Sequence, residues 1–367
     1  MKKAILVLAD GSVYEGRAFG AEADAYGEVV FNTSMTGYQE MLTDPSYAGQ
    51  IVVPTYPLIG NYGTSEHAVE SNRIQVRGFV VREECSQPNH YLSRQTVHEY
   101  LAQSGIPGIY GVDTRAITRK LRSYGVMMGM ITSNKTPEQA LAELKTLPDY
   151  GTIDFVRQVS TPTPYEWEPD LSAECRHHIV VLDCGLKYNI LRILRRHGCR
   201  VTAVPCTMKP EEILSLGPSG ILLSPGPGDP ELLDYIVETV RGLVGKRPIM
   251  GICLGNQLIA RAFGAKTFKL KFGHRGGNHP VRDLATGRIH ITAQNHGYAI
   301  DPDTLKDGLE VTQINLNDGT VEGLQHKELP IFCIQYHSEA SPGPLDNTYL
   351  FNKFLEMVRE GSEFETL

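Results

Sequence analysis

The sequence has no excess of positive charge, no Cys-x-x-Cys spacing and no long apolar run. A membrane-spanning helix needs about 20 successive apolar residues, so no membrane partner is expected. Seven cysteines without paired spacing indicate neither a disulfide framework nor a zinc site. A formal net charge of -7 leaves no basic surface of the kind that binds nucleic acid. These absences exclude membrane-spanning, disulfide-rich and nucleic-acid-binding classes.

The N-terminus also lacks the features of a secretory signal. Between Lys3 and Asp10 lie only six apolar residues, too few for the apolar core of a signal peptide and its cleavage site. A hydrophobic content of 41% and a charged content of 21% are ordinary for a globular protein. We therefore expect a cytoplasmic protein whose cysteines are reduced.

The length of 367 residues predicts two domains, because a single hydrophobic core seldom grows beyond about 250–300 residues. The clearest boundary is a proline-rich stretch at 160–170, since proline interrupts both helices and sheet ladders. We place an N-terminal domain at 1–155, a linker at 156–176 and a C-terminal domain at 177–362.

The N-terminal domain mixes strand and helix patterns. Apolar segments at 3–8 and 12–18 predict two strands joined by a tight Asp-Gly turn. Helices with clear start signals are predicted at 114–124 and 137–147. The mixture predicts an α+β domain. It contains no phosphate-binding loop, so we expect no ATP site or other cofactor in this chain.

The C-terminal domain has a different pattern, in which short runs of branched apolar residues alternate with helical stretches. Strands buried on both faces are typical of a parallel sheet, so we predict an α/β fold with a doubly wound, mostly parallel sheet. Ligands bind beyond the carboxyl ends of strands in such sheets. The expected parallel strands are 179–184, 201–205, 220–225 and 248–253, and the expected antiparallel strands are 289–294, 309–315, 320–325 and 330–335.

Cys253 lies at one of those carboxyl ends, within the sequence GICLGNQ at 251–257. A strand is expected before it and a helix at 257–263, so the thiol would protrude from a sharp turn and face the N-terminus of a helix. Gly251 and Gly255 would permit the strained torsions of such a turn. The pattern favours a nucleophile, and a buried structural cysteine is the alternative.

A thiol nucleophile needs a general base, and His337 is the informative candidate. Glu339 comes two residues later, on the same side of an extended chain, where it could hold the imidazole. The alternative is a chance surface pair. The N–H groups of Leu254 and of Gly226, in the turn at 223–230, could hold an oxyanion, although spacing alone favours a plain strand-to-helix turn at the second position.

Together these motifs resemble a class I glutamine amidotransferase domain, whose G-x-C-x-G-x-Q elbow corresponds to 251–257 and whose His-x-Glu corresponds to 337–339. More narrowly, the whole chain resembles the small, glutamine-hydrolysing subunits of carbamoyl-phosphate synthetases. That resemblance rests on FNTSMTGYQEMLTDPSYAGQIVVPTYPLIGNYG at 31–63, GVDTRAITRKLR at 111–122, KFGHRGGNHPV at 271–281, TAQNHGYAI at 292–300 and EASPGP at 339–344.

The resemblance implies that Cys253 attacks the side-chain amide of L-glutamine to form a thioester, that His337 moves protons and that Glu339 orients it. The implied partner is the large synthetase subunit of carbamoyl-phosphate synthetase, with ATP and Mg bound there and the N-terminal domain as docking surface. The implied glutamine contacts are Ser46, Gly226, Gly228, Leu254, Gln257, Asn295, Gly297 and Tyr298. On sequence alone, Ser46 could equally cap a turn.

Two positions depart from the family pattern. Asn256 stands where histidine is usual, and Ser338 stands where proline is frequent. Asn256 can hydrogen-bond the turn but cannot change charge beside the thiol. The serine is expected to loosen the link between His337 and Glu339 slightly.

Three histidines, His274, His279 and His296, lie in glycine-rich segments. No carboxylate or cysteine stands near them at ligand spacing, so we expect no metal site.

Two rival functions are a non-catalytic scaffold that only binds and regulates the large subunit, and a stand-alone γ-glutamyl hydrolase or cysteine peptidase. The intact Cys253, His337 and Glu339 count against the scaffold, and the additional N-terminal domain counts against the stand-alone hydrolase.

Overall fold

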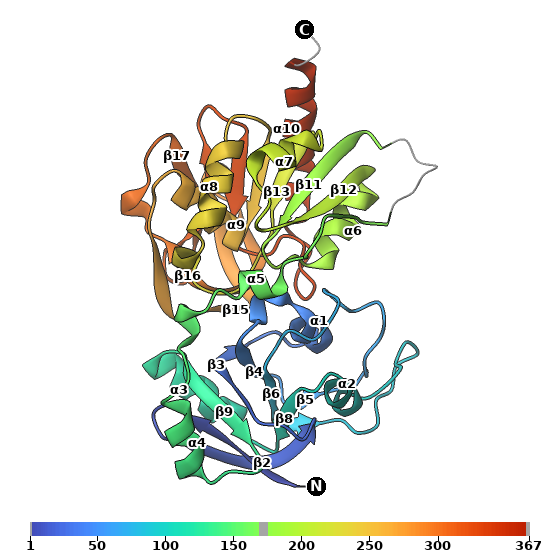
Figure 1. Ribbon diagram of the computed structural model, residues 1–367, viewed down its shortest axis with the longest axis vertical. Helices are drawn as coiled ribbons and strands as arrows, with labels where there is room; N and C mark the ends of the chain where they lie inside the picture. The colour runs from blue at the N-terminus through green and yellow to red at the C-terminus, as the bar shows by residue number, and fades with distance from the viewer. Residues whose placement is uncertain (1, 169–174, 365–367) are drawn as a thin grey trace. The chain divides into compact units, whose positions relative to one another are not determined.

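The computed structural model describes residues 2–168 and 175–364. By their internal contacts, the residues form two compact units, Met1–Ile153 and Asp154–Leu367 (Figure 1). The unit boundary therefore falls between Ile153 and Asp154.

The first unit is built on a closed β-barrel. In order of pairing its strands are β1 (Lys3–Leu8), β2 (Val13–Gly20), β8 (Pro107–Tyr110), β6 (Gly78–Val81), β4 (Gln50–Pro54), β3 (Ala25–Asn32) and β9 (Met127–Thr132). The register of β1 with β9 closes the barrel, so each of these strands is paired on both sides. A second, two-stranded sheet joins β5 (Leu58–Ile59) to β7 (Glu83–Glu84).

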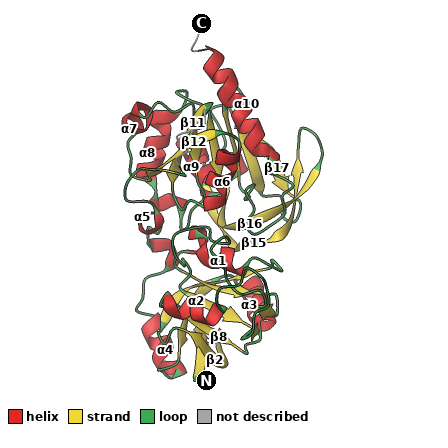
Figure 2. Ribbon diagram, turned by 90° about the vertical axis from the view of Figure 1, so that its right-hand side faces the viewer, coloured by secondary structure: helices red, strands yellow, loops and turns green. Residues whose placement is uncertain are grey.

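Helices pack around this barrel, as Figure 2 shows. They are α1 (Tyr38–Thr43), α2 (Val97–Gln103), α3 (Thr114–Tyr124) and α4 (Pro137–Leu144), with short 3-10 turns at Pro45–Tyr47 and Tyr150–Thr152. The start signals act as expected, since Asp113 accepts a hydrogen bond from the N–H of Ala116 and Thr136 forms a capping box with Gln139. The α+β prediction is confirmed for this unit, although the sequence did not predict closure into a barrel.

The second unit contains one ten-stranded sheet. Its parallel part pairs β12 (Cys199–Pro205), β11 (His177–Asp183), β13 (Gly220–Leu223), β14 (Ile249–Ile252) and β19 (Ile331–Ile334) in that order. Antiparallel strands continue beyond β19 as β18 (Val321–His326), β17 (Leu309–Asn315), β15 (Thr267–Asp283) and β16 (Ile289–Ile300).

Helices cover both faces of the parallel part (Figures 1 and 2). One face packs against α7 (Pro210–Ser215), α8 (Asp234–Leu243) and α9 (Leu254–Ala262), and the other packs against α6 (Tyr188–Arg196) and α10 (Tyr349–Phe364). Two apolar layers therefore enclose the sheet, which explains why its central strands are apolar on both sides. The prediction of a doubly wound α/β fold is confirmed.

Several local expectations differ from the structure. The helix expected at 257–263 begins earlier, at Leu254, and a 3-10 turn at Pro230–Leu232 precedes α8. A further 3-10 turn lies at Pro302–Thr304. The sequence did not predict β15, because its glycines and two register shifts hide the alternation of a regular strand.

The stretch expected as a linker, 156–176, carries secondary structure. Val156–Val159 forms α5, and Tyr165–Glu166 forms β10, which pairs antiparallel with β12. The backbone N–H of Thr161 donates to a carboxylate oxygen of Asp183 at 2.8 Å. These residues belong to the second unit, and 169–174 lie outside the described residues.

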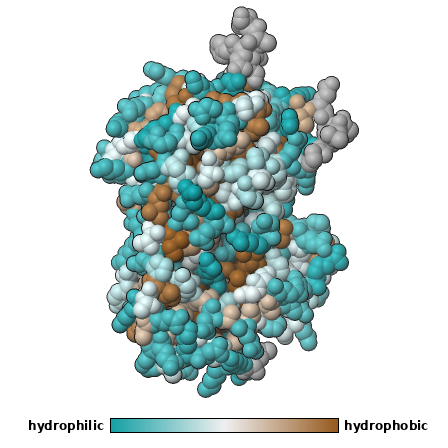
Figure 3. Space-filling model, in the orientation of Figure 1, coloured by the Kyte–Doolittle hydropathy of each residue, from teal (hydrophilic) through white to brown (hydrophobic). Residues whose placement is uncertain are grey.

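The surface is mostly polar on the face that Figure 3 shows, where hydrophobic side chains lie in small separate groups. Scattered exposed apolar residues are normal for a globular protein. Within 2–168 and 175–364, no helix is both long and apolar enough to cross a membrane.

Candidate active site

Cys253 occupies the turn between β14 and α9. Its φ of 54° and ψ of -105° lie outside the usual regions for a residue with a side chain, and such a conformation costs on the order of 1–3 kcal/mol. Its backbone N–H still donates to the carbonyl of Ile334 at 2.8 Å, so the strain begins at the last paired residue of the strand. This is the geometry of a nucleophile elbow, which projects a side chain beyond the edge of a sheet.

Glycines allow the elbow to pack directly against the neighbouring strand ends. A Cβ atom on Gly255 would lie 2.4 Å from the carbonyl oxygen of Leu223, and one on Gly226 would lie 2.1 Å from that of Cys184. Both distances are far below van der Waals contact. Glycine at 255 therefore lets the elbow reach the end of β13, and glycine at 226 lets the loop after β13 reach the residue that follows β11.

A chain of buried amides leads to the thiol of Cys253. The Nε2 atom of Gln335 donates to Sγ at 3.7 Å, and its Oε1 accepts hydrogen bonds from the Asn256 and Gln257 amides, each at 3.1 Å. The thiol itself donates to the carbonyl of Asn295 at 3.8 Å. Sequence reasoning did not single out Gln335, although a polar residue directly after the apolar strand β19 was a visible signal.

The amide chain predicts a measurable effect on thiol reactivity. In Gln335→Leu the thiolate loses its amide donor, so the alkylation rate of Cys253 by iodoacetamide is expected to fall about 10-fold near neutral pH. Gln325→Leu is the matched control, because Gln325 lies on β18 and its amide donates to Glu310. Equal alkylation rates in wild type and Gln335→Leu would contradict the role of this amide.

His337 and Glu339 form a buried pair. Nδ1 of His337 lies 2.6 Å from Oε1 of Glu339, and their side chains are 3% and 0% exposed. The alternative of a surface pair is therefore wrong. The expected extended conformation is also wrong, because the N–H of Ala340 bonds back to the carbonyl of His337 at 3.1 Å and closes a turn. The turn, rather than strand alternation, brings carboxylate and imidazole together.

In this pair, each side chain stabilises the charged form of the other. Burial by itself would lower the pKa of His337, but the Glu339 carboxylate and the Cys253 side chain raise it to about 10. Burial would raise the pKa of Glu339, but the charges of Lys187 and His337 lower it to about 2. Glu339 contacts Nδ1, so the imidazole Nε2 is the nitrogen that would face a substrate.

The other second-unit residues of the predicted site lie on α9, on β16 and in the loop after β13. Leu254 is the first residue of α9, and Gln257 donates to the carbonyl of Tyr298 at 2.8 Å. Asn295, Gly297 and Tyr298 lie on β16. The loop after β13 contains Gly226 and Gly228, and Gly228 has a φ of 91°, which favours glycine.

Ser46 belongs to the first unit, within the 3-10 turn Pro45–Tyr47. The cap of that turn is Asp44, whose carboxylate accepts from the N–H of Ser46 at 2.9 Å. The alternative interpretation of Ser46 as the turn cap is therefore wrong. Its own hydroxyl is buried and has no hydrogen-bond partner within the described part of the chain.

Comparison with known proteins places these features in a family. Residues 6–131 match the family model described as carbamoyl-phosphate synthase small chain, CPSase domain, and residues 180–357 match that of glutamine amidotransferase class-I. The chain is 54% identical to a carbamoyl phosphate synthase small chain of Staphylococcus epidermidis, over 100% of this chain and 98% of that protein. The chain belongs to the carbamoyl-phosphate synthase small-chain family.

Another small chain of the family, from Aquifex aeolicus, is 50% identical, and the match covers 98% of this chain and 99% of that protein. Among solved structures, a putative GMP synthase subunit of Thermoplasma acidophilum is similar with a TM-score of 0.46 and 25% identity, over 52% of this chain and 98% of that one. The family models and the small-chain relatives confirm the resemblance predicted from the motifs. This member of the small-chain family is an enzyme subunit with a glutamine amidotransferase domain.

In this small-chain family member, carboxylates from distant parts of the sequence lie beside the cluster of His274, His279 and His296. His274 contacts Asp318 at 2.7 Å and Glu322 at 3.5 Å, and ligand atoms of His274, His296 and Glu322 lie within 4.8 Å of one another. The expectation that no carboxylate lies near the histidines is therefore wrong, because the fold brings Asp318 and Glu322 next to His274. Both ring nitrogens of His296 already contact oxygens, those of Tyr298 and Gln294, which a metal would have to displace.

His274 is expected to make the stability of the second unit depend on pH. Burial would lower its pKa, but Asp318 and Glu322 raise it from 6.5 to about 9. A raised pKa stabilises the fold fully below about 6.5, and this stabilisation, on the order of 3 kcal/mol at most, is lost as pH rises through about 9.

Urea unfolding of wild type and His274→Gln across that pH range tests this expectation. The variant should lose less stability with rising pH than wild type does. The contribution of His337 is common to both proteins and cancels in the comparison. Parallel stability curves would contradict the assignment.

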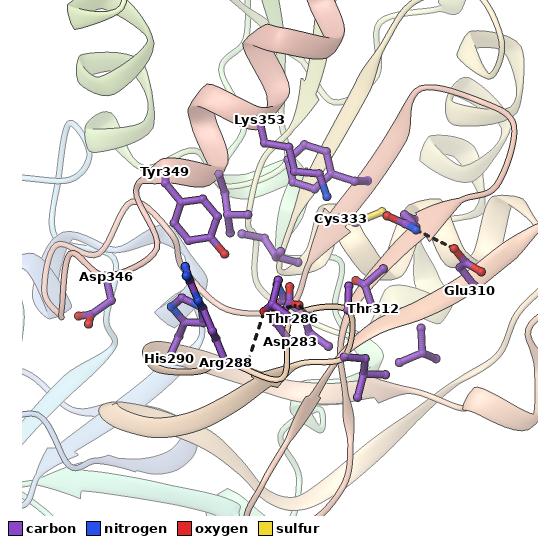
Figure 4. A pocket seen from close by; sticks show the side chains of 18 residues that line it. Asp283, Thr286, Arg288, His290, Glu310, Thr312, Cys333, Asp346, Tyr349 and Lys353 are labelled. Carbon is purple, nitrogen blue, oxygen red and sulfur yellow. Dashed lines mark hydrogen bonds between the residues drawn. The ribbon is translucent and has the colours of Figure 1, made fainter.

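A cavity of about 750 Å³ lies elsewhere in the second unit, beside the first turn of α10 (Figure 4). Its described lining includes Arg288, His290, Glu310, Tyr349 and Lys353, and none of the residues predicted for catalysis or glutamine binding. This cavity is therefore separate from the candidate active site.

Proposed function

We propose that this chain is the glutaminase subunit of a carbamoyl-phosphate synthetase. It hydrolyses L-glutamine and passes the ammonia to a large synthetase subunit, which makes carbamoyl phosphate from bicarbonate and ATP. One observation carries the proposal. The elbow thiol of Cys253 and the buried His337–Glu339 pair occur together in the glutamine amidotransferase domain of a small-chain family member.

In the first half of the reaction, His337 takes the thiol proton and Sγ of Cys253 attacks the amide carbon of the glutamine side chain. The N–H groups of Leu254 and Gly226 hold the resulting oxyanion. The C–N bond then breaks as His337 gives its proton to the departing ammonia. The product on the enzyme is a γ-glutamyl thioester.

In the second half, His337 removes a proton from water, and the hydroxide attacks the thioester carbonyl. The C–S bond breaks, the thiolate of Cys253 recovers the proton from His337, and glutamate leaves. Glu339 holds the imidazole in the orientation that leaves Nε2 available in both halves, as the 2.6 Å contact at Nδ1 supports.

Glutamine recognition is proposed to use uncharged groups. The amino-acid end of glutamine carries an ammonium and a carboxylate, which backbone groups and neutral side chains can satisfy. We assign these contacts to Ser46, Gly226, Gly228, Leu254, Gln257, Asn295, Gly297 and Tyr298.

A large subunit is needed because carbamoyl phosphate synthesis consumes ATP. Neither half of this chain carries a phosphate-binding loop. We therefore assign ATP and Mg to the partner, no cofactor to this chain, and a cytoplasmic location to the complex. Internal transfer of ammonia would keep it from being protonated and lost to solvent.

The test is glutamine hydrolysis by the purified chain, alone and with its cognate large subunit, ATP and bicarbonate. Weak hydrolysis alone and strong stimulation by the partner would support the proposal. Hydrolysis that the partner does not alter would indicate a free-standing hydrolase. A complex that forms without any hydrolysis would indicate the non-catalytic scaffold.

A further inference from the structure

Lys187 is a buried cation that neither the motifs nor the mechanism above uses. It lies between β11 and α6, and its side chain is 2% exposed. Its Nζ atom is 3.2 Å from Oε1 of Glu339, and it donates a short hydrogen bond of 2.5 Å to the carbonyl of Ala340. Both partners belong to the turn that follows His337.

The sheet explains how a residue so distant in sequence reaches this turn. Strands β11, β14 and β19 run parallel, so their carboxyl ends share one edge of the sheet. Lys187 follows β11, Cys253 follows β14 and His337 follows β19. The order of the parallel strands therefore places Lys187 at the same edge of the sheet as Cys253 and His337.

The turn held by Lys187 is strained. Ala340 and Ser341 both have positive φ, 57° and 52°, and each such residue costs on the order of 1 kcal/mol or more. Besides the lysine bond to Ala340, the Asn189 amide donates to the carbonyl of Glu339 at 2.6 Å. Two side chains from the start of α6 thus fix two successive carbonyl groups where the strain begins.

The charge on Lys187 matters because His337 changes its own charge during the proposed reaction. When His337 is protonated, Glu339 has two buried cations beside it. After His337 has given its proton to ammonia, Lys187 is the one cation beside the carboxylate within 2–168 and 175–364. A buried carboxylate without a cation would take up a proton and lose its hold on the imidazole.

We propose that Lys187 is a positioning residue of the glutaminase reaction, which keeps Glu339 ionised and in place while His337 is neutral. The inference rests on the proposed function, but its charge effect on the imidazole can be tested without glutamine. In the part of the chain that the structure describes, the charged or titratable groups that act on His337 are Glu339, Cys253 and Lys187.

Lys187→Met tests this, because methionine keeps much of the length and removes the charge. We expect kcat for glutamine hydrolysis to fall at least about 10-fold with KM changed less than about 3-fold. The substitution should slow the proton transfers by His337 and leave glutamine binding nearly unchanged. Lys187→Arg keeps the charge and should recover part of kcat. Lys353→Met, on α10 over the ring of Phe332, is the control for a lysine-to-methionine change.

The second readout is the pH dependence of Cys253 alkylation by iodoacetamide. The positive charge of Lys187 disfavours a protonated His337. Lys187→Met is therefore expected to raise the pH at the midpoint of the alkylation profile that reports deprotonation of His337, by about one pH unit. This measurement needs no glutaminase activity. A wild type that fails to hydrolyse glutamine would therefore refute the proposed function while the midpoint still tests Lys187.

A double-mutant cycle with Glu339→Gln completes the design. If Lys187 acts through Glu339, adding Lys187→Met to Glu339→Gln should lower kcat less than about 2-fold further. If the loss of kcat in the double variant equals the product of the two single losses, the proposal is overturned. A lower kcat of Lys187→Met with an unmoved alkylation midpoint would also overturn it, because that result indicates a purely structural role. If Lys187→Met does not fold, Lys187→Arg is tested alone. An unmoved midpoint with a partly reduced kcat is then the expected result, and a midpoint that moves upward by about one pH unit although the charge is kept would overturn the proposal.

Discussion

Cys253→Ser is expected to lower kcat for glutamine hydrolysis at least about 10⁴-fold, because in the proposed mechanism it removes the nucleophile and with it the covalent route. A hydroxyl is far less acidic than a thiol, so His337 cannot deprotonate it comparably. The change is nearly isosteric, so the strained elbow should survive. The measurement is glutamate release by the complex with the large subunit, ATP and bicarbonate.

The control for this variant is synthesis from ammonia. Carbamoyl phosphate formation by the complex from ammonium chloride should stay near the wild-type rate, since that route bypasses the thiol. Cys333→Ser offers a second control, because Cys333 is a buried cysteine on β19 that lines the separate cavity. Glutamine hydrolysis above a tenth of the wild-type rate in Cys253→Ser would refute the thioester mechanism.

Gly255→Ala is expected to be the most destabilising single-methyl change at the elbow, lowering the free energy of unfolding by about 3 kcal/mol. The added Cβ would lie 2.4 Å from the backbone oxygen of Leu223 and 2.8 Å from its Cβ. Neither atom can move by a side-chain rotation, so α9 or β13 has to shift. Thiol alkylation at Cys253 should change as well, because α9 begins directly after it.

Gly361→Ala is the matched control for the glycine change. Gly361 lies in α10, where an added Cβ would come closest to the Cγ of Pro248, at 3.3 Å. Alanine is favoured over glycine within a helix by about 0.5–1 kcal/mol, so the two effects should nearly cancel. Urea unfolding compares both variants with wild type. Equal stabilities for Gly255→Ala and wild type would mean that the elbow is looser than its contacts require.

The elbow was predictable because its signals are local. A strand ends, glycines flank Cys253, and an apolar helical pattern follows, all within one short segment. The predicted helix nevertheless began too late, because the glycine at 255 lowers helix propensity while tight packing against Leu223 overrides it. The pairing of His337 with Glu339 was predicted for a wrong reason, since a turn joins them and not an extended chain.

The departure at Asn256 shows where local reasoning stops. The sequence showed only that this amide can hydrogen-bond the turn. In the structure its Nδ2 donates to Gln335, 79 positions further along the chain. Lys187 and Glu339 meet in the same way across the sheet edge. Neither contact has a periodicity or a spacing that a reader of the sequence could detect.

The two-part organisation, the alternation of strands and helices in the second unit and the position of Cys253 at a strand end could all be predicted, because each depends on residues close together in the chain. Which side chains meet at that strand end could not be predicted, because they come from distant parts of the chain. Strand order places β11 and β19 on either side of β13 and β14, and so brings Lys187 and Gln335 to the elbow region. Long-range pairing of this kind depends on the packing of the whole sheet, which no local pattern records.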